Sequence, residues 1–326
     1  MKLFFSIILS TTILFTQAQS QSVNKPQQIE AATSAIPSVK VAAQAGNWKQ
    51  QVKLTPADAN AWFNYYNWVD RDKALSGTEK AKELKEALST SRQYIVGTWQ
   101  YSLMIFLQSG KKDSAALSDA LRLAEDKTAV YPYAAQLAII KENRQSLREY
   151  CLLINKAAPM PKSKYEYHYN TLMSAEQNGI IYAKGLNDLV PLAILQQVYG
   201  IRPDIGLKYY DNTVSTDAYL CLSLGKEILE KYPDALYTGL LIRTKKAQNF
   251  SLEKIFENFS FQYLDAVNFL DEEDRLIYRN YLPSLIIQYK NYLENNDPKA
   301  SASKSRIDHL AMLTGTTEMV KNLLNR

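Results

Sequence analysis

The stretch that decides the fold is residues 178–211, NGIIYAKGLNDLVPLAILQQVYGIRPDIGLKYYD. Its runs at 180–183 and 205–210 are rich in β-branched and aromatic residues, which favours strands. The apolar run at 189–199 between them predicts a helix, with Asp188 as its N-cap and Pro191 in its first turn. A helical crossover joins parallel strands, so the stretch predicts a right-handed βαβ unit.

The chain after this stretch predicts one more helix and one more strand. Ser215 or Thr216 is expected to cap a helix that runs to about residue 232. A third strand is expected at 235–242, where Gly239 weakens the pattern.

The sequence on both sides of this α/β segment is helical in pattern. Trp62, Tyr65, Tyr66 and Val69 recur at the i, i+3, i+4, i+7 spacing of one helix face. We therefore predict a mostly α chain, in which a degenerate helical-repeat, tetratricopeptide-like array contains a small inserted βαβ unit. The array is expected at 47–164, the α/β unit at 165–250 and a C-terminal helical region at 251–326.

The N-terminal residues predict export. Lys2 precedes an apolar run at 3–15, and small residues follow at 16–18. The run is shorter than the roughly 20 residues that span a bilayer, so 1–18 is typical of a cleaved signal peptide, with an uncleaved anchor as the alternative. Residues 19–46 lack a sustained period and predict a disordered tether. We expect a product that is periplasmic or extracellular, with no transmembrane segment once the signal is removed.

Composition restricts the classes of partner and cofactor. The formal net charge of +5 is spread along the chain, so we expect no nucleic-acid partner. Cys151 and Cys221 lie in apolar helical patterns and are expected to be buried thiols, with a disulfide as the alternative. His168 and His309 lack ligand-spaced neighbours, so we expect neither a metal site nor a cofactor.

The candidate ligand site lies where the two parallel strands should end. Asn187 and Asp188 follow the first strand, and Asp211 and Asn212 follow the second. Open α/β sheets bind ligands at this edge, so the four side chains could hold a sugar hydroxyl or a cation. The alternative is that Asp188 caps its helix and Asp211 caps a turn. Arg202 falls at the opposite edge, where pairing with Asp204 or with a helix C-terminus is expected.

Tyrosine is unusually frequent, with 22 residues. One group comprises Tyr165, Tyr167 and Tyr169, and another lies around Trp62 and Trp68. Most are expected in helix–helix cores, with an aromatic binding surface as the alternative.

One part of the deciding stretch resembles a known family. A Leu-Gln helix (Leu195, Gln196) followed by Gly-Ile-Arg-Pro-Asp at 200–204 is similar to the soluble C-terminal region of a family of bacterial membrane proteins of unknown function. That family is grouped with protein O-mannosyltransferase-like glycosyltransferases and has related exported proteins. Its usual Gly-Asp-x-Asp has Leu186 in place of the first acid here, and only Asp188 remains. The family's membrane part has no counterpart in this sequence. The resemblance therefore implies an accessory or binding fold rather than glycosyl transfer.

These observations favour an exported, non-enzymatic binding or scaffold protein that acts with other proteins in a bacterial envelope complex. The alternative is a carbohydrate-binding or glycosylation-accessory module, with glycans as partners, that uses the loop around Asp188. The sequence has no phosphate loop, dinucleotide fingerprint or G-x-S-x-G elbow. We therefore expect no catalytic residues, although an enzyme with an unrecognised site stays open.

Overall fold

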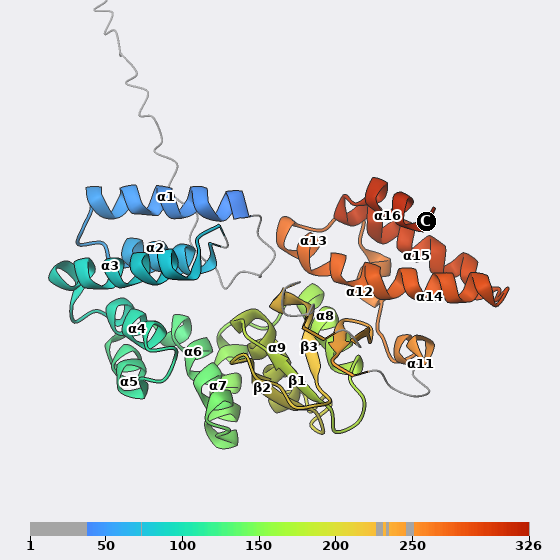
Figure 1. Cartoon of the computed structure of the whole chain (residues 1–326). Helices are drawn as coiled ribbons and strands as arrows, with labels where there is room; N and C mark the ends of the chain where they lie inside the picture. The colour runs from blue at the N-terminus through green and yellow to red at the C-terminus, as the bar shows by residue number, and fades with distance from the viewer. Residues whose placement is uncertain (1–37, 73, 226–230, 233–234, 246–250, 326) are drawn as a thin grey trace, which may run out of the picture.

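The computed structural model describes residues 38–72, 74–225, 231–232, 235–245 and 251–325 (Figure 1). The expected signal peptide at 1–18 and the first part of the expected tether, 19–37, lie outside these residues. The described chain is mostly helical and holds one small mixed sheet, which confirms the predicted fold class.

The N-terminal half consists of helices that pack mainly against their neighbours in sequence, as the helical-repeat pattern predicts. Figure 1 shows α1 to α3 lying together, with α6 and α7 between α4–α5 and the sheet. The helices are α1 (Ser38–Leu54), α2 (Ala59–Arg71), α3 (Gly77–Ile95), α4 (Trp99–Gln108), α5 (Ser114–Leu123), the 3₁₀ turn η1 (Lys127–Ala129), α6 (Tyr131–Ile140) and α7 (Arg144–Ala157).

Helix α1 starts earlier than expected. The predicted tether extended to residue 46, but residues 38–46 are helical. Ala45 is buried together with Trp48 and Val52 against α2. Alanine has the highest intrinsic helix propensity, and packing of this apolar face overrides the irregular pattern of the stretch.

The sheet confirms the predicted βαβ unit. Strands β1 (Ile180–Ala183) and β2 (Gly206–Tyr209) are parallel neighbours, with Ile180 opposite Gly206 and Ala183 opposite Tyr209. Helix α9 (Leu186–Gln197) forms the crossover between them. The strand order is β2-β1-β3-β5-β4 among the described residues.

The chain after β2 differs from the prediction. Strand β3 (Tyr219–Cys221) pairs parallel to β1 on its other side, so the helix expected from Ser215 or Thr216 to residue 232 is wrong there. A short apolar run fits a buried strand and a buried helix equally well, and burial between β1 and β5 decides for the strand. The 3₁₀ turn η2 (Leu222–Leu224) follows directly.

The expected third strand at 235–242 is instead a hairpin. Strands β4 (Leu236–Tyr237) and β5 (Leu241–Arg243) are antiparallel, and β5 also pairs with β3. Gly239 lies between them at φ +80°, a conformation that a residue with a Cβ rarely adopts.

The two faces of the sheet have separate cores. Ile181 and Ala183 pack with α9, α6 and α7 residues, whereas Tyr182 packs on the other face with Leu220 and Tyr210. This alternation follows from the two-residue repeat of a strand.

Helix α8 (Lys162–Met173) lies between the sheet layer and the C-terminal helices and contacts α9, α12 and α13. Tyr165 and Tyr169 pack on the core of the sheet, and Tyr167 belongs to the C-terminal core. The C-terminal elements are α11 (Leu252–Phe256), α12 (Gln262–Ala266), α13 (Glu272–Tyr278), the 3₁₀ turn η3 (Arg279–Tyr281), α14 (Leu282–Glu294), α15 (Lys299–Thr314) and α16 (Thr317–Leu324).

Two further expectations concern the thiols and the membrane. Cys151 and Cys221 are both buried and both free, so the alternative of a disulfide is wrong. None of the helices in the described ranges has the length and apolar character that crossing a membrane requires.

Candidate functional site

The four residues singled out from the sequence fall into two separate places. β1 and β2 end at the same edge of the sheet, as expected. Asp211 and Asn212, however, are exposed, and Asp211 Oδ1 accepts hydrogen bonds from Thr213 N at 3.2 Å and Thr213 Oγ1 at 2.6 Å. These bonds lower the pKa of Asp211. Asp211 therefore closes a turn, which was the alternative to a ligand role.

Asp188 is not the N-cap of helix α9. The helix begins at Leu186 with Gly185 as the N-cap, so Asp188 lies within its first turn and the predicted cap is wrong. The prediction assumed that Pro191 stands in the first turn, where no helical hydrogen bond is lost. The structure instead has Pro191 inside the helix, one turn further on.

The Asp188 carboxylate turns toward the segment that follows β3. Its Oδ2 accepts a hydrogen bond of 2.5 Å from Ser223 Oγ, on η2. Burial raises the pKa of Asp188 to about 6, and the bond from Ser223 opposes this rise. Ser223 escaped the sequence analysis because the expected helix covered it.

Asp188 and Asn187 line a partly open cavity of about 290 Å³. Its walls come from α7, α8, α9 and α13, and most of its side chains are aliphatic. The main apolar lining residues are Ile154, Met160, Leu186, Val190, Pro191, Ile194, Leu276 and Ile277. An apolar cavity with a few convergent polar groups is the usual form of a small-molecule site.

The polar groups of this cavity include two atoms without a partner. Asn187 Nδ2 and His168 Nδ1 are buried and make no hydrogen bond within the described part of the chain. Burial, aided by the nearby Lys164, lowers the pKa of His168 to about 3, so its ring is neutral. Buried polar groups are normally paired, so such atoms indicate a missing partner.

The remaining polar residues of the cavity are paired with each other. Lys164 Nζ on α8 lies 3.1 Å from Glu273 Oε1 on α13, and each side chain is about one third exposed. Asn280 Nδ2 donates to the Tyr167 hydroxyl at 2.8 Å. Sequence reasoning missed this group because its members come from segments about a hundred residues apart, and no local motif joins them.

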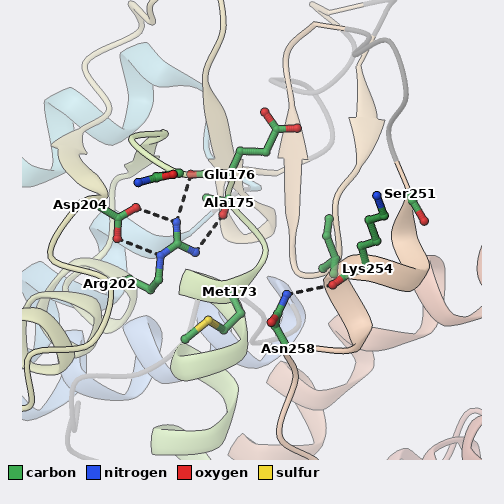
Figure 2. A pocket seen from close by; sticks show the side chains of 10 residues that line it. Met173, Ala175, Glu176, Arg202, Asp204, Ser251, Lys254 and Asn258 are labelled. Atoms are coloured by element: carbon green, nitrogen blue, oxygen red, sulfur yellow. Dashed lines mark hydrogen bonds and ion pairs between the residues drawn. The ribbon is translucent and has the colours of Figure 1, made fainter.

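A second, more open cavity of about 610 Å³ lies beside Arg202, near the other end of β2 (Figure 2). Arg202 forms two hydrogen bonds to Asp204, at 2.9 and 2.8 Å. It also donates to the carbonyl of Leu172 in the last turn of α8, and to those of Ala175 and Glu176 just after the helix. Both expectations for Arg202, pairing with Asp204 and with a helix C-terminus, are confirmed.

The Arg202 cluster is structural in character. Arg202 lowers the pKa of Asp204 to about 2. Every N–H of its guanidinium group donates to a protein acceptor, and Figure 2 shows the bonds to Asp204, Ala175 and Glu176. This second cavity therefore offers a ligand fewer unsatisfied groups than the cavity at Asp188.

The aromatic side chains mostly form cores, as expected. Trp62, Tyr65, Tyr66 and Trp68 are buried in the packing of α1 to α4. Tyr165 stacks on Tyr169 with ring centroids 6.4 Å apart.

Comparison with the models of known protein families gives no match, and a search of curated proteins gives none either. The resemblance to the soluble region of the membrane protein family therefore stays a prediction. The described residues also contain no group of three or more His, Cys, Asp or Glu side chains placed to hold a metal ion.

Proposed function

We propose that this chain is an exported binding protein and that the cavity at Asp188 and Asn187 is its ligand site. The observation that supports this most is an aliphatic cavity lined by Asp188 and Asn187, where the Asn187 amide nitrogen has no hydrogen-bond partner among the described residues. A half-buried carboxylate and a buried unpaired amide nitrogen each cost stability, and a bound ligand offsets that cost.

The cavity supports ligand binding more directly than the scaffold function that the sequence favoured. The exposed large apolar side chains of the described residues are scattered along the chain; they include Leu54 on α1, Leu152 on α7 and Met312 on α15. Single exposed apolar residues are normal on a protein surface and do not define a docking face.

The chemistry of the lining also ranks the ligands. Sugars are bound by aromatic faces and many hydrogen bonds. Among the described lining residues, Tyr167 is the one tyrosine, and it is paired to Asn280. An aliphatic ligand with one polar end fits these walls better than a glycan does.

Export is the second component of the proposal and rests on the leader pattern at residues 1–18. Expression of the whole chain in a bacterium, followed by N-terminal sequencing of the protein from the periplasm or the medium, tests it. A new N-terminus next to Ala18 supports export. An intact Met1, or protein confined to the cytoplasm, contradicts it.

Ligand binding is tested with 3-methyl-1-butanol, a small branched probe with one polar end. Saturation-transfer NMR should show contact with the wild-type protein. Leu276→Trp, which fills the cavity from α13, should remove the signal. Leu293→Trp is the matched control, because Leu293 is 50 % exposed on α14 and is not among the cavity residues. Signals that are equal in all three proteins would contradict the cavity as the site, once melting curves show that the variants are folded.

A further inference from the structure

Among the residues that the structure describes, the charges around the cavity leave one anion without a counterion. Asp188 and Glu273 are its acidic lining residues, and Lys164 is the one lysine or arginine among the described lining residues. Lys164 pairs with Glu273 at 3.1 Å, and the His168 ring is neutral. Asp188 receives a hydrogen bond from Ser223, a neutral hydroxyl. A cationic group on the ligand would balance this charge, because buried charges are otherwise paired.

A second polar group beside Asp188 requires the opposite chemistry. Asn187 is the neighbouring residue in the first turn of α9, and its Nδ2 is a donor with no acceptor among the described residues. An amide nitrogen can be satisfied by a carbonyl or a carboxylate. The same end of the cavity thus calls for a hydrogen-bond acceptor next to a cation.

The rest of the cavity calls for a short aliphatic group. Ile154, Val190, Ile194 and Leu276 offer hydrocarbon walls from three helices. The volume of about 290 Å³ is at the lower end of the roughly 300 to 1,000 Å³ typical of small-molecule sites. A long acyl chain would exceed this space, and its carboxylate would be repelled by Asp188.

A single chemical group carries all three features. We infer that the cavity binds an aliphatic α-aminoacyl group with a free ammonium, in which the ammonium pairs with Asp188, the carbonyl accepts from Asn187 and the side chain contacts the aliphatic walls. This inference rests on the proposed function of the cavity as a ligand site. A free amino acid such as leucine and the N-terminal residue of a peptide share this chemistry.

Three compounds separate the contributions of the ligand groups. L-leucinamide has the ammonium, the carbonyl and the side chain. 4-Methylpentanamide lacks only the ammonium, and 3-methylbutylamine lacks only the carboxamide, which carries the carbonyl. Calorimetry or NMR titration should show that L-leucinamide binds the wild-type protein at least tenfold more tightly than either of these. L-leucine and the dipeptide Leu-Gly then distinguish a free amino acid from a peptide N-terminus, according to which binds more tightly.

Two variants assign the contacts. Asp188→Asn should lower the affinity for L-leucinamide about tenfold or more and leave the affinity for 4-methylpentanamide unchanged. Asn187→Leu should lower the affinities for L-leucinamide and 4-methylpentanamide but leave the affinity for 3-methylbutylamine unchanged. Asp211→Asn is the matched control, because Asp211 is exposed and closes a turn outside the cavity. It should change none of the three affinities.

The outcomes distinguish this inference from the proposed function. The inference is overturned if the wild-type protein binds L-leucinamide and 4-methylpentanamide with equal affinity. It is also overturned if Asp188→Asn binds L-leucinamide as tightly as the wild type does. If L-leucinamide, L-leucine and Leu-Gly all fail to bind while 3-methyl-1-butanol still contacts the cavity, the inference is wrong and the ligand site stands. If the alcohol also fails to bind, the proposed function itself is contradicted.

Discussion

Ser223 Oγ lies 2.5 Å from Asp188 Oδ2, and this hydrogen bond joins the turn after β3 to the first turn of α9. It holds in place a carboxyl group whose pKa burial raises from 3.8 to about 6. Between these two pH values the folded protein binds a proton that the unfolded chain has released. The stabilisation by the neutral carboxyl is therefore fully present below about pH 3.8 and is lost as the pH rises through about 6.

The first prediction concerns the pH dependence of Asp188→Asn. The asparagine stays neutral, so the variant should gain stability relative to the wild type between pH 4.5 and pH 8. A raised pKa corresponds to about 1.4 kcal/mol per unit, and partial access from the cavity reduces this, so we expect a gain of about 1–2 kcal/mol. Urea unfolding of both proteins at the two pH values measures it. A difference that does not change with pH would contradict the buried carboxyl.

The second prediction concerns Glu166, which is 4 % exposed on α8. Its carboxylate accepts from the backbone N–H groups of Tyr263 at 2.6 Å and Leu264 at 3.0 Å. Glu166→Ala should lower the free energy of unfolding by about 3 kcal/mol, because two buried donors lose their acceptor. Glu166→Gln, which keeps one acceptor oxygen, should cost less.

The control for Glu166 is Glu149→Ala. Glu149 is exposed on α7, and its removal should change the unfolding free energy by no more than about 0.5 kcal/mol. Chemical denaturation of the three variants makes the comparison. Equal losses at the two positions would show that Glu166 does not hold the α12 segment to α8.

The third prediction separates steric conflict from backbone strain at Gly239. A Cβ at this position would lie 2.6 Å from Ser174 Oγ and 2.7 Å from Phe259 Cζ. Gly97 has a similar φ of +88°, but a Cβ there would meet no described atom within 4 Å. Gly97→Ala should cost about 1–2 kcal/mol from the left-handed backbone alone. Gly239→Ala should cost a further 1–3 kcal/mol, roughly, from overpacking. Equal losses in thermal unfolding would exclude the close approach of α8 to the β4–β5 turn.

The fourth prediction concerns the two thiols. Burial raises the pKa of Cys151 to about 12 and raises that of Cys221 as well, so neither is a thiolate at neutral pH. Iodoacetamide should modify neither cysteine in the folded protein. Denaturation without a reducing agent should expose both, giving two additions by mass spectrometry. An unmodified denatured protein would indicate a disulfide.

The sequence was most informative where a pattern is local. The strand runs at 180–183 and 205–210 and the helix between them follow from period, propensity and turn residues, and β1, α9 and β2 confirm them. Asp211 was also anticipated as a turn residue. Arg202 was assigned correctly because a loop arginine beside an aspartate has few other partners.

The errors arose where tertiary packing decides. The run around Tyr219 suits a helix or a strand, and only its place beside β1 makes it β3. Local rules placed Pro191 in the first turn of this helix, whereas α9 begins earlier, at Leu186, and has Pro191 in its interior. His168 and Glu273 join Asp188 around one cavity although they come from distant helices, and no spacing in the sequence encodes that meeting.

Helix α8 has a consequence for how this chain can be divided. One side of the helix packs on the core of the sheet through Tyr165 and Tyr169. The other side contacts the C-terminal helices through Glu166, Tyr167 and Asn170. A fragment cut after the sheet would leave the Glu166 carboxylate and the Asn170 amide without their partners in an apolar surface. The C-terminal helices expressed alone would lose the acceptor for two backbone amides. Helices α6 and α7 also pack on α9 and the sheet. A cut directly after the sheet should therefore not leave two folded parts, and α8, the sheet and the C-terminal helices should unfold in a single transition.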